Sequence, residues 1–489
     1  MIITMAESVL EKSARGSIYN IGVSGITIIL GFVRSILLMR LLGSSQFGLI
    51  ALSLFFTTIV DPFSSLGIDS ALVQNRNPTQ RSFSTHFIIR LVLWIVVLSM
   101  GVLMSPLLRW IYRSQTVVVD IFILFLCMNL IQATYATPGV VLRREMRFNV
   151  IANLNLLSSL AMTVTAPLLA YLGAGLWSLV AEQVIGPVVR WVGIWFFIRP
   201  WRLSLGFDWA EAKSSIKFGL QVTSSSLLGV LLDRFDDFWT GTTLGSTALG
   251  FYSRAWEFAQ YPERALVTPI TNVFFSAYSA LQDNKTELTK VFFRSSAFLV
   301  RVGFLIAVVL IIISPELIII LFTAAWLPIV PLFRLMVFYI VFDPFYNNLS
   351  YLIIGVGHPG LLTRVRTVQV GLFIVAVIIF ARAWGTKGVA WAANLMMVSG
   401  TIMLFMYSRK FVQYSIRRLF QWPLIAAILS ITTGYVLILY GGWAGIWINL
   451  LLKTTGVTGV YLIALYLAEH EVFNEYTWKI LKPLWERFR

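Results

Sequence analysis

Apolar runs long enough to cross a membrane recur along almost the whole 489-residue chain. The hydrocarbon core of a bilayer is about 30 Å thick, so about 20 consecutive apolar residues in a helix span it. Hydrophobic residues make up 58% of the chain and charged residues only 12%, whereas a soluble chain carries about 25% charged residues. Because a backbone inside hydrocarbon must satisfy its own hydrogen bonds, runs of this length form helices. The sequence therefore predicts an all-α integral membrane protein.

The apolar runs predict about fourteen transmembrane helices. They cover approximately residues 17–41, 47–73, 84–108, 117–139, 150–171, 175–198, 215–241, 248–274, 292–313, 329–354, 362–381, 388–408, 421–441 and 444–467. An even number of spans puts both termini on the same side of the membrane.

The basic residues indicate which side that is. Of the 38 Lys and Arg, about 23 lie in alternate loops beginning with the N-terminal segment, and about five lie in the opposite loops. Cytoplasmic loops carry the excess of basic residues, so we expect both termini in the cytoplasm. The net charge of +16 then reflects topology, and the expected partner is the phospholipid bilayer and not a nucleic acid.

Two pairs of loop segments repeat along the chain in the same order. The first pair is "LLGSSQFGLIAL" (41–52) and "TLGSTALGFYSR" (243–254), which superpose with a shift of about 202 residues. This shift puts Gly43 on Gly245, Ser44 on Ser246 and Gly48 on Gly250. The second pair is "YLGAGLWSLVA" (171–181) and "AWGTKGVAWAA" (383–393). Six spans per copy make a parallel repeat, with a pseudo-two-fold axis along the membrane normal, which is an architecture of secondary transporters.

The repeat divides the chain into two six-helix lobes plus two extra C-terminal helices. We predict a cytoplasmic amphipathic N-terminal segment (1–16), an N-lobe of spans 1–6 (17–199), a cytoplasmic linker (200–214), a C-lobe of spans 7–12 (215–408), a linker with spans 13 and 14 (409–467) and a cytoplasmic tail (468–489).

The sequence favours transport over catalysis. It contains no G-x-x-x-x-G-K-[ST] motif for ATP, and its longest polar loops, 199–214 and 275–291, are too short for a catalytic domain. The single cysteine, Cys127, lies in an apolar run and cannot form a thiolate metal cage. We therefore expect no catalytic residue, no metal site and no cofactor.

Four stretches resemble one known family. They are "ARGSIYNIGVSGITIILGFVRSILLMRLLGSSQFGLIALSLFFTTIVDPFSSLGIDSALVQ", "LRREMRFNVIANLNLL", "FFSAYSALQDNKTELTKVFFRSSAFL" and "PELIIILFTAAWLPIVPLFRLM". Together they resemble bacterial Wzx-type polysaccharide flippases, in the branch exporting colanic-acid-like and teichuronic-acid-like polymers. The resemblance covers approximately residues 14–410. The family has Gly three residues before the Trp of the last stretch, where this chain has Thr323.

The resemblance implies a member of the multidrug/oligosaccharidyl-lipid/polysaccharide exporter superfamily. Such a protein is a two-lobed alternating-access transporter of the bacterial inner membrane. It moves undecaprenyl-pyrophosphate-linked oligosaccharide from the cytoplasmic to the periplasmic leaflet. Coupling to an H⁺ or Na⁺ gradient and contact with a polysaccharide polymerase or export machinery are open options. The alternatives are a peptidoglycan-precursor flippase, an ion-coupled drug exporter, or, from another class, a membrane glycosyltransferase or polysaccharide polymerase.

An anionic substrate requires cations inside the bundle, and Arg matches phosphate oxygens with its planar fork. The basic residues inside spans include Arg90, Arg190 and Lys453 beside the predicted set. The predicted cavity cations are Arg34, Arg254, Arg264, Arg301 and Arg334. For Arg34, Arg254 and Arg301 a structural ion pair is the competing interpretation.

Acids inside spans are candidates for gating or ion coupling. They are Asp61, Asp233, Asp236, Asp237, Glu257 and Asp343. Asp61 and Asp343 each precede a mid-span proline, which frees a backbone carbonyl that could help to hold a cation. A kinked helix with a hydrogen-bonded acid is the alternative.

The stretch "LLGVLLDRFDDFWTGTTLG" (227–245) concentrates four charges in an apolar run. Arg234 can reach Asp237 at i+3, which leaves an acidic face. The repeat puts Asp236 opposite Arg34, so we expect these two, with Asp233 or Asp237 as substitute acids, to pair and close the periplasmic side when the cavity is open to the cytoplasm.

Overall fold

The structure is a computed structural model that describes residues 2–75, 77–204, 206–264, 274–275, 277–440 and 445–487. Within these ranges every regular element is a helix. The helices are α1 (Ile2–Leu41), α2 (Ser44–Ser65), α3 (Ile68–Gln74), α4 (Gln80–Ile111), α5 (Val117–Arg144), α6 (Phe148–Tyr171), α7 (Leu176–Val192) with its π-helical end (Gly193–Ile198), α8 (Trp209–Thr243), α9 (Ser246–Pro262), α11 (Lys285–Leu321), a 3₁₀ turn (Ala324–Trp326), α12 (Ile329–Gly355), α13 (Pro359–Ser408), α14 (Ile416–Tyr440) and α15 (Ile446–Arg487).

Eleven helices in the described part of the chain are long and apolar enough to cross a membrane. One of them, α13, joins two helices at Gly385, where the backbone leaves the helical region. The charged helix α8 is not among the eleven. The predicted eighth span, 248–274, runs into residues 265–273, which lie outside the described residues. The all-α membrane class is confirmed, and the number fourteen stays a prediction.

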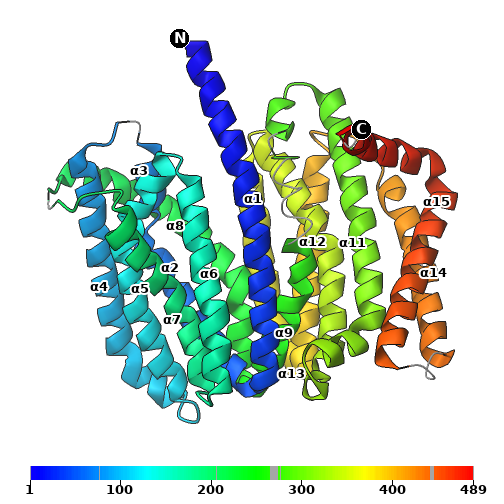
Figure 1. Cartoon of the computed structure of the whole chain (residues 1–489), viewed down its shortest axis with the longest axis horizontal. Coiled ribbons are helices and arrows are strands. Elements are labelled where there is room, and N and C mark those ends of the chain that lie inside the picture. Colours follow the sequence, from blue (N-terminus) through cyan, green and yellow to red (C-terminus); the bar gives the residue numbers. More distant parts are fainter. Residues whose placement is uncertain are drawn as a thin grey trace. The chain divides into compact units, whose positions relative to one another are not determined.

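The chain folds as two compact units, Met1–Arg254 (unit 1) and Ala255–Arg489 (unit 2). Unit 1 runs from blue to green in Figure 1, and unit 2 from green to red. Their boundary falls inside α9, after Arg254, so unit 1 includes the whole of α8, whereas the predicted N-lobe ended at residue 199. The reason is local, since α8 packs against α2, α3 and α4. The lobe boundaries and the terminal segments stay predictions, and the side chains of residues 2–18 and 470–487 lie outside the described part.

The first repeated motif forms a reciprocal contact inside unit 1. A Cβ on Gly48 of α2 would lie 1.8 Å from the Ser246 carbonyl oxygen, and one on Gly250 of α9 would lie 1.8 Å from the Ser44 carbonyl oxygen. The Ser45 and Ser246 hydroxyls are 3.1 Å apart. Each motif therefore presents its second glycine to the helix start of the other motif. Such mutual packing is what a local pseudo-two-fold axis produces, and it supports the repeat.

The second repeated motif contains a shared backbone conformation. Gly175, at the start of α7, has φ 56° and ψ −126°, and Gly385, in the middle of α13, has φ 58° and ψ −137°. Only glycine adopts this region without strain. A glycine is therefore required at the corner between consecutive spans in both halves of the chain.

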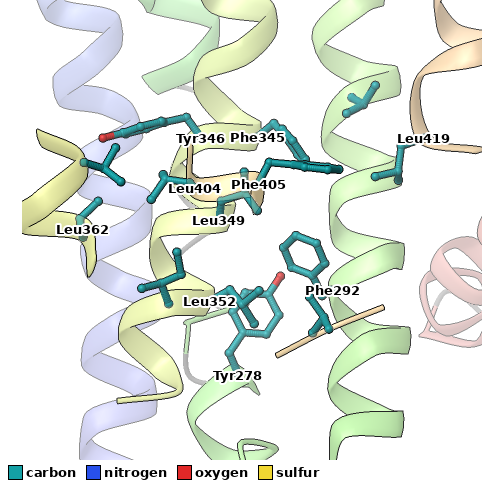
Figure 2. Packing of buried hydrophobic residues seen from close by; sticks show 14 of the residues in the cluster. Tyr278, Phe292, Phe345, Tyr346, Leu349, Leu352, Leu362, Leu404, Phe405 and Leu419 are labelled. Carbon is teal, nitrogen blue, oxygen red and sulfur yellow. The ribbon is translucent and has the colours of Figure 1, made fainter. Parts of the chain in front are cut away.

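Unit 2 has an aromatic core between α11, α12 and α13. Figure 2 shows Tyr278, Phe292, Phe345 and Phe405 in this cluster, all of them buried. The Tyr278 hydroxyl lies 2.6 Å from Ser295 Oγ and donates to Asn348 Oδ1 at 2.8 Å. The polar ends of buried rings thus find partners, as they must in an apolar interior.

The last two helices, α14 and α15, pack against α11 within unit 2. A second buried cluster joins Val308 and Ile312 of α11 to Ala426 of α14 and Tyr461 of α15. A Cβ on Gly434 of α14 would lie 2.6 Å from Ile312, so this glycine lets the two helices approach closely.

Candidate functional site

A cavity of about 520 Å³ lies beside α1 and α6 in unit 1. We call it the α1–α6 cavity. Its basic residues are Arg34 of α1 and Arg190 of α7, and its polar lining includes Ser24, Thr27 and Asn155. Its size falls in the range of about 300–1,000 Å³ that is typical of ligand sites. The α1–α6 cavity therefore combines two guanidinium groups with hydroxyl and amide groups inside a membrane bundle.

Arg34 makes a carboxylate contact at this cavity. Its Nε donates to Glu182 Oε1 of α7 at 2.7 Å, and its Nη1 contacts Thr163 Oγ1 of α6 at 3.3 Å. The Arg34 and Glu182 side chains are only 13% and 17% exposed. A charge inside a membrane bundle is costly without a partner, so Glu182 neutralises Arg34 in this conformation. The contact joins two residues 148 positions apart, and the sequence held no signal that paired them.

Arg190 completes the cationic lining. Its Nε donates to the Gly186 carbonyl one turn earlier in α7, at 3.4 Å, which is a long contact. The Ser158 hydroxyl of α6 donates to the same carbonyl at 3.2 Å. Arg190 was among the basic residues inside spans but outside the predicted set. Its relevance became visible only from the cavity that it shares with Arg34.

Three charged residues of α8, Arg234, Asp236 and Asp237, form one cluster with Tyr252 of α9. Arg234 Nη1 donates to Asp237 Oδ2 at 3.0 Å, which confirms the pair predicted from the i, i+3 spacing. Asp236 and Asp237 are each 5% exposed. The Tyr252 hydroxyl donates to Asp236 Oδ2 at 2.6 Å, and the Asp237 N–H donates to Asp236 Oδ1 at 3.0 Å. These bonds offset the cost of placing several charges in one apolar helix.

The structure gives Arg34 and Asp236 different partners. Arg34 binds Glu182, and Asp236 binds Tyr252. The gate contact between Arg34 and Asp236 was predicted for a cavity open to the cytoplasm, and it stays a prediction. Asp233, the substitute acid, is exposed on α8.

Two predicted arginines of unit 2 hold helices together. Arg301 of α11 donates to both carboxylate oxygens of Glu469 of α15, at 2.8, 2.7 and 2.6 Å, and its Nη1 donates to the Ala297 carbonyl at 2.7 Å. Arg301 therefore makes the structural ion pair that was its competing interpretation. Arg334 Nε of α12 donates to the Ile311 carbonyl of α11 at 3.0 Å. Pro315 cannot donate to that carbonyl, and Arg334 together with the Ser314 hydroxyl, which donates to it at 2.9 Å, replaces the missing hydrogen bond.

The other two predicted arginines lie in different surroundings. The Arg254 guanidinium lies 4.8 Å from the centre of the Phe47 ring, which is a cation–π contact inside unit 1. Arg264 is exposed and donates to Gln260 one turn earlier. Neither residue lines the α1–α6 cavity.

The remaining predicted acids make short-range contacts. Asp61 is exposed and accepts from Ser64, Asp343 accepts from Asn347 at 3.1 Å, and Glu257 accepts from Tyr261 at 3.3 Å. In the described residues no group of three or more His, Cys, Asp or Glu is placed to hold a metal ion. Asp61 and Asp343 thus have the hydrogen bonds expected of acids beside a proline kink.

Solved structures share this fold. The lipid II flippase MurJ, in an inward closed conformation, matches with a TM-score of 0.76 at 13% identity, over 92% of this chain and 98% of that chain. An inward-facing multidrug resistance MATE family transporter of the MOP superfamily matches with a TM-score of 0.59 at 17% identity, over 80% and 97%. The chain therefore has the fold of this class of membrane transporter.

Sequence comparison places the chain in one family. The family of polysaccharide biosynthesis proteins matches residues 37–331, and the chain belongs to it. The chain is 24% identical over 404 residues to the lipopolysaccharide biosynthesis protein WzxC of Escherichia coli (strain K12), covering 81% of both chains. It is 25% identical over 266 residues to the succinoglycan biosynthesis transport protein ExoT of Rhizobium meliloti (strain 1021), covering 52% of this chain and 51% of that protein. The chain is therefore a multi-pass membrane protein of the polysaccharide biosynthesis family.

Proposed function

We propose that the chain is an alternating-access flippase for undecaprenyl-pyrophosphate-linked oligosaccharide. It moves this substrate from the cytoplasmic to the periplasmic leaflet of the bacterial inner membrane, with both of its termini in the cytoplasm. The observation that carries the proposal is the α1–α6 cavity, which presents Arg34 and Arg190 inside the membrane bundle of a polysaccharide biosynthesis protein. A pyrophosphate cannot cross hydrocarbon without cationic partners.

The substrate phosphates exchange with Glu182 on Arg34. In the conformation described here Glu182 neutralises Arg34 through a 2.7 Å contact from Arg34 Nε at the cavity. An incoming phosphate oxygen makes a charge-assisted hydrogen bond of similar kind, and the planar fork of Arg suits two such oxygens. A ligand shifts a conformational equilibrium only by its different affinity for the two states. Exchange of partners at Arg34 supplies this difference in affinity. The Glu182 carboxylate is part of the protein, whereas the phosphate is part of the transported substrate.

The α8 cluster is where we place coupling to an H⁺ or Na⁺ gradient. Asp236 is buried and holds two hydrogen-bond donors, the Tyr252 hydroxyl and the Asp237 N–H. A buried carboxylate next to a second one carries a cost that a bound cation or proton removes. The reciprocal contact of α2 and α9 includes Gly250, two residues before the Tyr252 of this cluster, and is where we place closure toward the periplasm.

Two functions from the same superfamily compete with this one, a peptidoglycan-precursor flippase and an ion-coupled drug exporter. The lipid II flippase has the same fold, so the fold does not separate them. Family membership favours exported polysaccharide, with a polysaccharide polymerase or export machinery as the protein partner.

A deletion strain tests the proposal. Loss of the chain should remove surface polysaccharide and accumulate lipid-linked repeat units on the cytoplasmic face, as measured by a membrane-impermeant glycan label. Wild-type protein should restore export, whereas Arg34→Ala should not. Unchanged surface polysaccharide together with defective cell-wall synthesis would favour the peptidoglycan-precursor alternative. Unchanged polysaccharide with increased drug sensitivity would favour the exporter.

A further inference from the structure

A second cavity of unit 1, of about 380 Å³, lies between α3, the start of α4 and the start of α8. We call it the α3–α4–α8 pocket. It shares no lining residue with the α1–α6 cavity. Most of its polar lining consists of hydroxyl and amide side chains, namely Gln74, Asn75, Ser82, Thr85, Ser214 and Ser215.

Rigid corners build the walls of this pocket. The chain turns from α2 into α3 at Leu66 and Gly67, which have φ of 41° and 59°. A Cβ on Gly219 of α8 would lie 1.6 Å from the Leu66 carbonyl oxygen, so only glycine lets α8 pack against this turn. The Asp208 N–H, at the start of α8, donates to Thr85 of α4 at 2.8 Å. The three walls are therefore fixed to one another before any ligand binds.

Glu211 provides an acceptor that needs a ligand donor. It lies in the first turn of α8, and its Oε1 accepts from the Ser82 hydroxyl at 2.6 Å. Its Oε2 is buried and accepts no hydrogen bond from any residue that the structure describes. A buried acceptor without a donor is unfavourable, whereas a ligand hydroxyl would satisfy it.

The charge of the pocket selects against an anionic ligand. Among the described residues, its ionisable lining residues are Glu211 and His86, and the described lining holds no Lys or Arg. Both ring nitrogens of His86 have partners, with Nδ1 2.9 Å from Thr137 Oγ1 and Nε2 3.1 Å from Asp69 Oδ1. The nearby Arg90 pairs with the same Asp69 oxygen at 3.4 Å. Arg143 also pairs with Asp69, and Arg144 Nη1 donates to the carbonyls of Leu72, Val73 and Asn75, so protein acceptors already hold these guanidinium groups. The Glu211 carboxylate is the acid of the described lining, and it repels a pyrophosphate.

These features fit a neutral ligand rich in hydroxyl groups. The pocket offers hydrogen bonds through several hydroxyl and amide groups and one carboxylate, and an apolar face through the Phe218 ring. A sugar ring has matching hydroxyl groups and an apolar face of its own. We propose that the α3–α4–α8 pocket is a saccharide subsite that binds sugar hydroxyls through Glu211, Ser214 and Ser215 and thereby determines which glycan is transported. This proposal rests on the proposed function and assigns the sugar and the pyrophosphate to different cavities of unit 1.

Binding measurements on the purified full chain test the subsite. The two probes are inorganic pyrophosphate and the lipid-free oligosaccharide repeat unit, released by mild hydrolysis from the polysaccharide that the strain exports. Glu211→Gln keeps an acceptor for Ser82 but replaces the second oxygen by a donor, so the fold is preserved. We expect it to weaken oligosaccharide binding at least tenfold and to leave pyrophosphate binding unchanged. Ser215→Phe, which fills the pocket, should do the same.

The chain offers a matched control in Glu287. Glu287 occupies the same position in the first turn of α11, with its N–H bonded to the capping Asn284, as Glu211 is bonded to the capping Asp208. Its side chain is 47% exposed and pairs with Lys290 at 2.7 Å. Glu287→Gln removes the same charge from an equivalent helix start and should leave binding of both probes unchanged.

The outcomes separate this inference from the proposed function. Oligosaccharide binding that persists in both Glu211→Gln and Ser215→Phe would overturn the saccharide subsite, even if export still requires Arg34. An equal loss of oligosaccharide binding in Glu287→Gln would also overturn the saccharide subsite, because the loss would then follow from the change in net charge. Export that is independent of Arg34, with no pyrophosphate binding in the wild type, would instead overturn the proposed function.

Discussion

Arg34 and Arg301 are both arginines within membrane helices, and each binds a glutamate on a distant helix, yet the two pairs differ in geometry. Arg34 meets Glu182 through one nitrogen at 2.7 Å. Arg301 meets Glu469 through two nitrogens and both carboxylate oxygens, with a further bond to its own helix. Burial does not distinguish them, since the arginine side chains are 13% and 15% exposed.

The difference between these pairs indicates their different roles. A bidentate pair satisfies both partners and fixes their orientation, so it is suited to holding α15 against α11. Glu469 sits where the backbone of α15 departs from helical angles, with φ −139° and ψ 36°, which lets its carboxylate face Arg301. The contact between Arg34 Nε and Glu182 lies at a cavity, where a second anion can approach. Arg34 is therefore the better candidate for exchange of partners, and Arg301 for permanent attachment.

Removal of Arg301 should give the largest loss of stability. Arg301→Ala leaves Glu469 buried without its partner, and stranding one member of a buried pair costs about 3–5 kcal/mol. Thermal unfolding in detergent should detect this loss, together with a lower membrane level. Replacing both partners, as Arg301→Met with Glu469→Leu, should recover most of the stability. Unchanged unfolding of the single variant would break the comparison, because Arg301 would then not hold α15.

Removal of Arg34 should give the largest loss of export per folded molecule. Arg34→Ala removes a charge-assisted hydrogen bond to the substrate, worth about 1.5–3 kcal/mol, so we expect export to fall about 10- to 150-fold. Arg34→Lys should restore part of it, because an ammonium supplies charge without the planar fork. The measurement is surface polysaccharide divided by membrane protein level. Normal export by Arg34→Ala would show that Arg34 does not bind the substrate.

Neutralising Glu182 should strengthen anion binding at Arg34, whereas removing Arg34 should weaken it. Glu182→Gln leaves Arg34 with a weaker partner, so affinity for inorganic pyrophosphate should rise several-fold, to about tenfold. Glu469→Gln is the matched change in the other pair and should not alter pyrophosphate binding. Isothermal calorimetry on the purified chain compares the two. If both variants gained affinity equally, the single and bidentate pairs would be equivalent, and the proposed exchange at Arg34 would be wrong.

The smallest expected effect is a partial rescue by charge exchange. Arg34→Asp and Asp236→Arg should each impair export, and the double variant should export a few times more than the worse single variant, because a pair of reversed sign can form in the cytoplasm-open state. The double variant could instead export no better than the worse single variant. In that case Arg34 and Asp236 do not pair, and Glu182 is the partner of Arg34 in both states.

The sequence predicted those features that depend on local or repeated patterns. Long apolar runs gave the all-α membrane class, because hydrocarbon allows few other backbones. The pair of Arg234 and Asp237 followed from a spacing of three residues on one helix. The motif around Gly48 and Gly250 indicated a repeat, and its two copies are in reciprocal contact in unit 1.

Only the tertiary structure decided which partners the charged side chains have on other helices. Glu182 and Glu469 lie 148 and 168 positions from the arginines that they bind, and helical periodicity says nothing about contacts between helices so far apart in sequence. Arg34, Arg301 and Arg334 had the same appearance in the sequence, as arginines within apolar runs. Packing puts Arg34 beside a cavity and Arg301 against a carboxylate. It puts Arg334 on a backbone carbonyl that a proline leaves without its usual N–H donor. Chemistry at the site depends on these contacts, which follow from how the helices cross and not from the order of residues along any one of them.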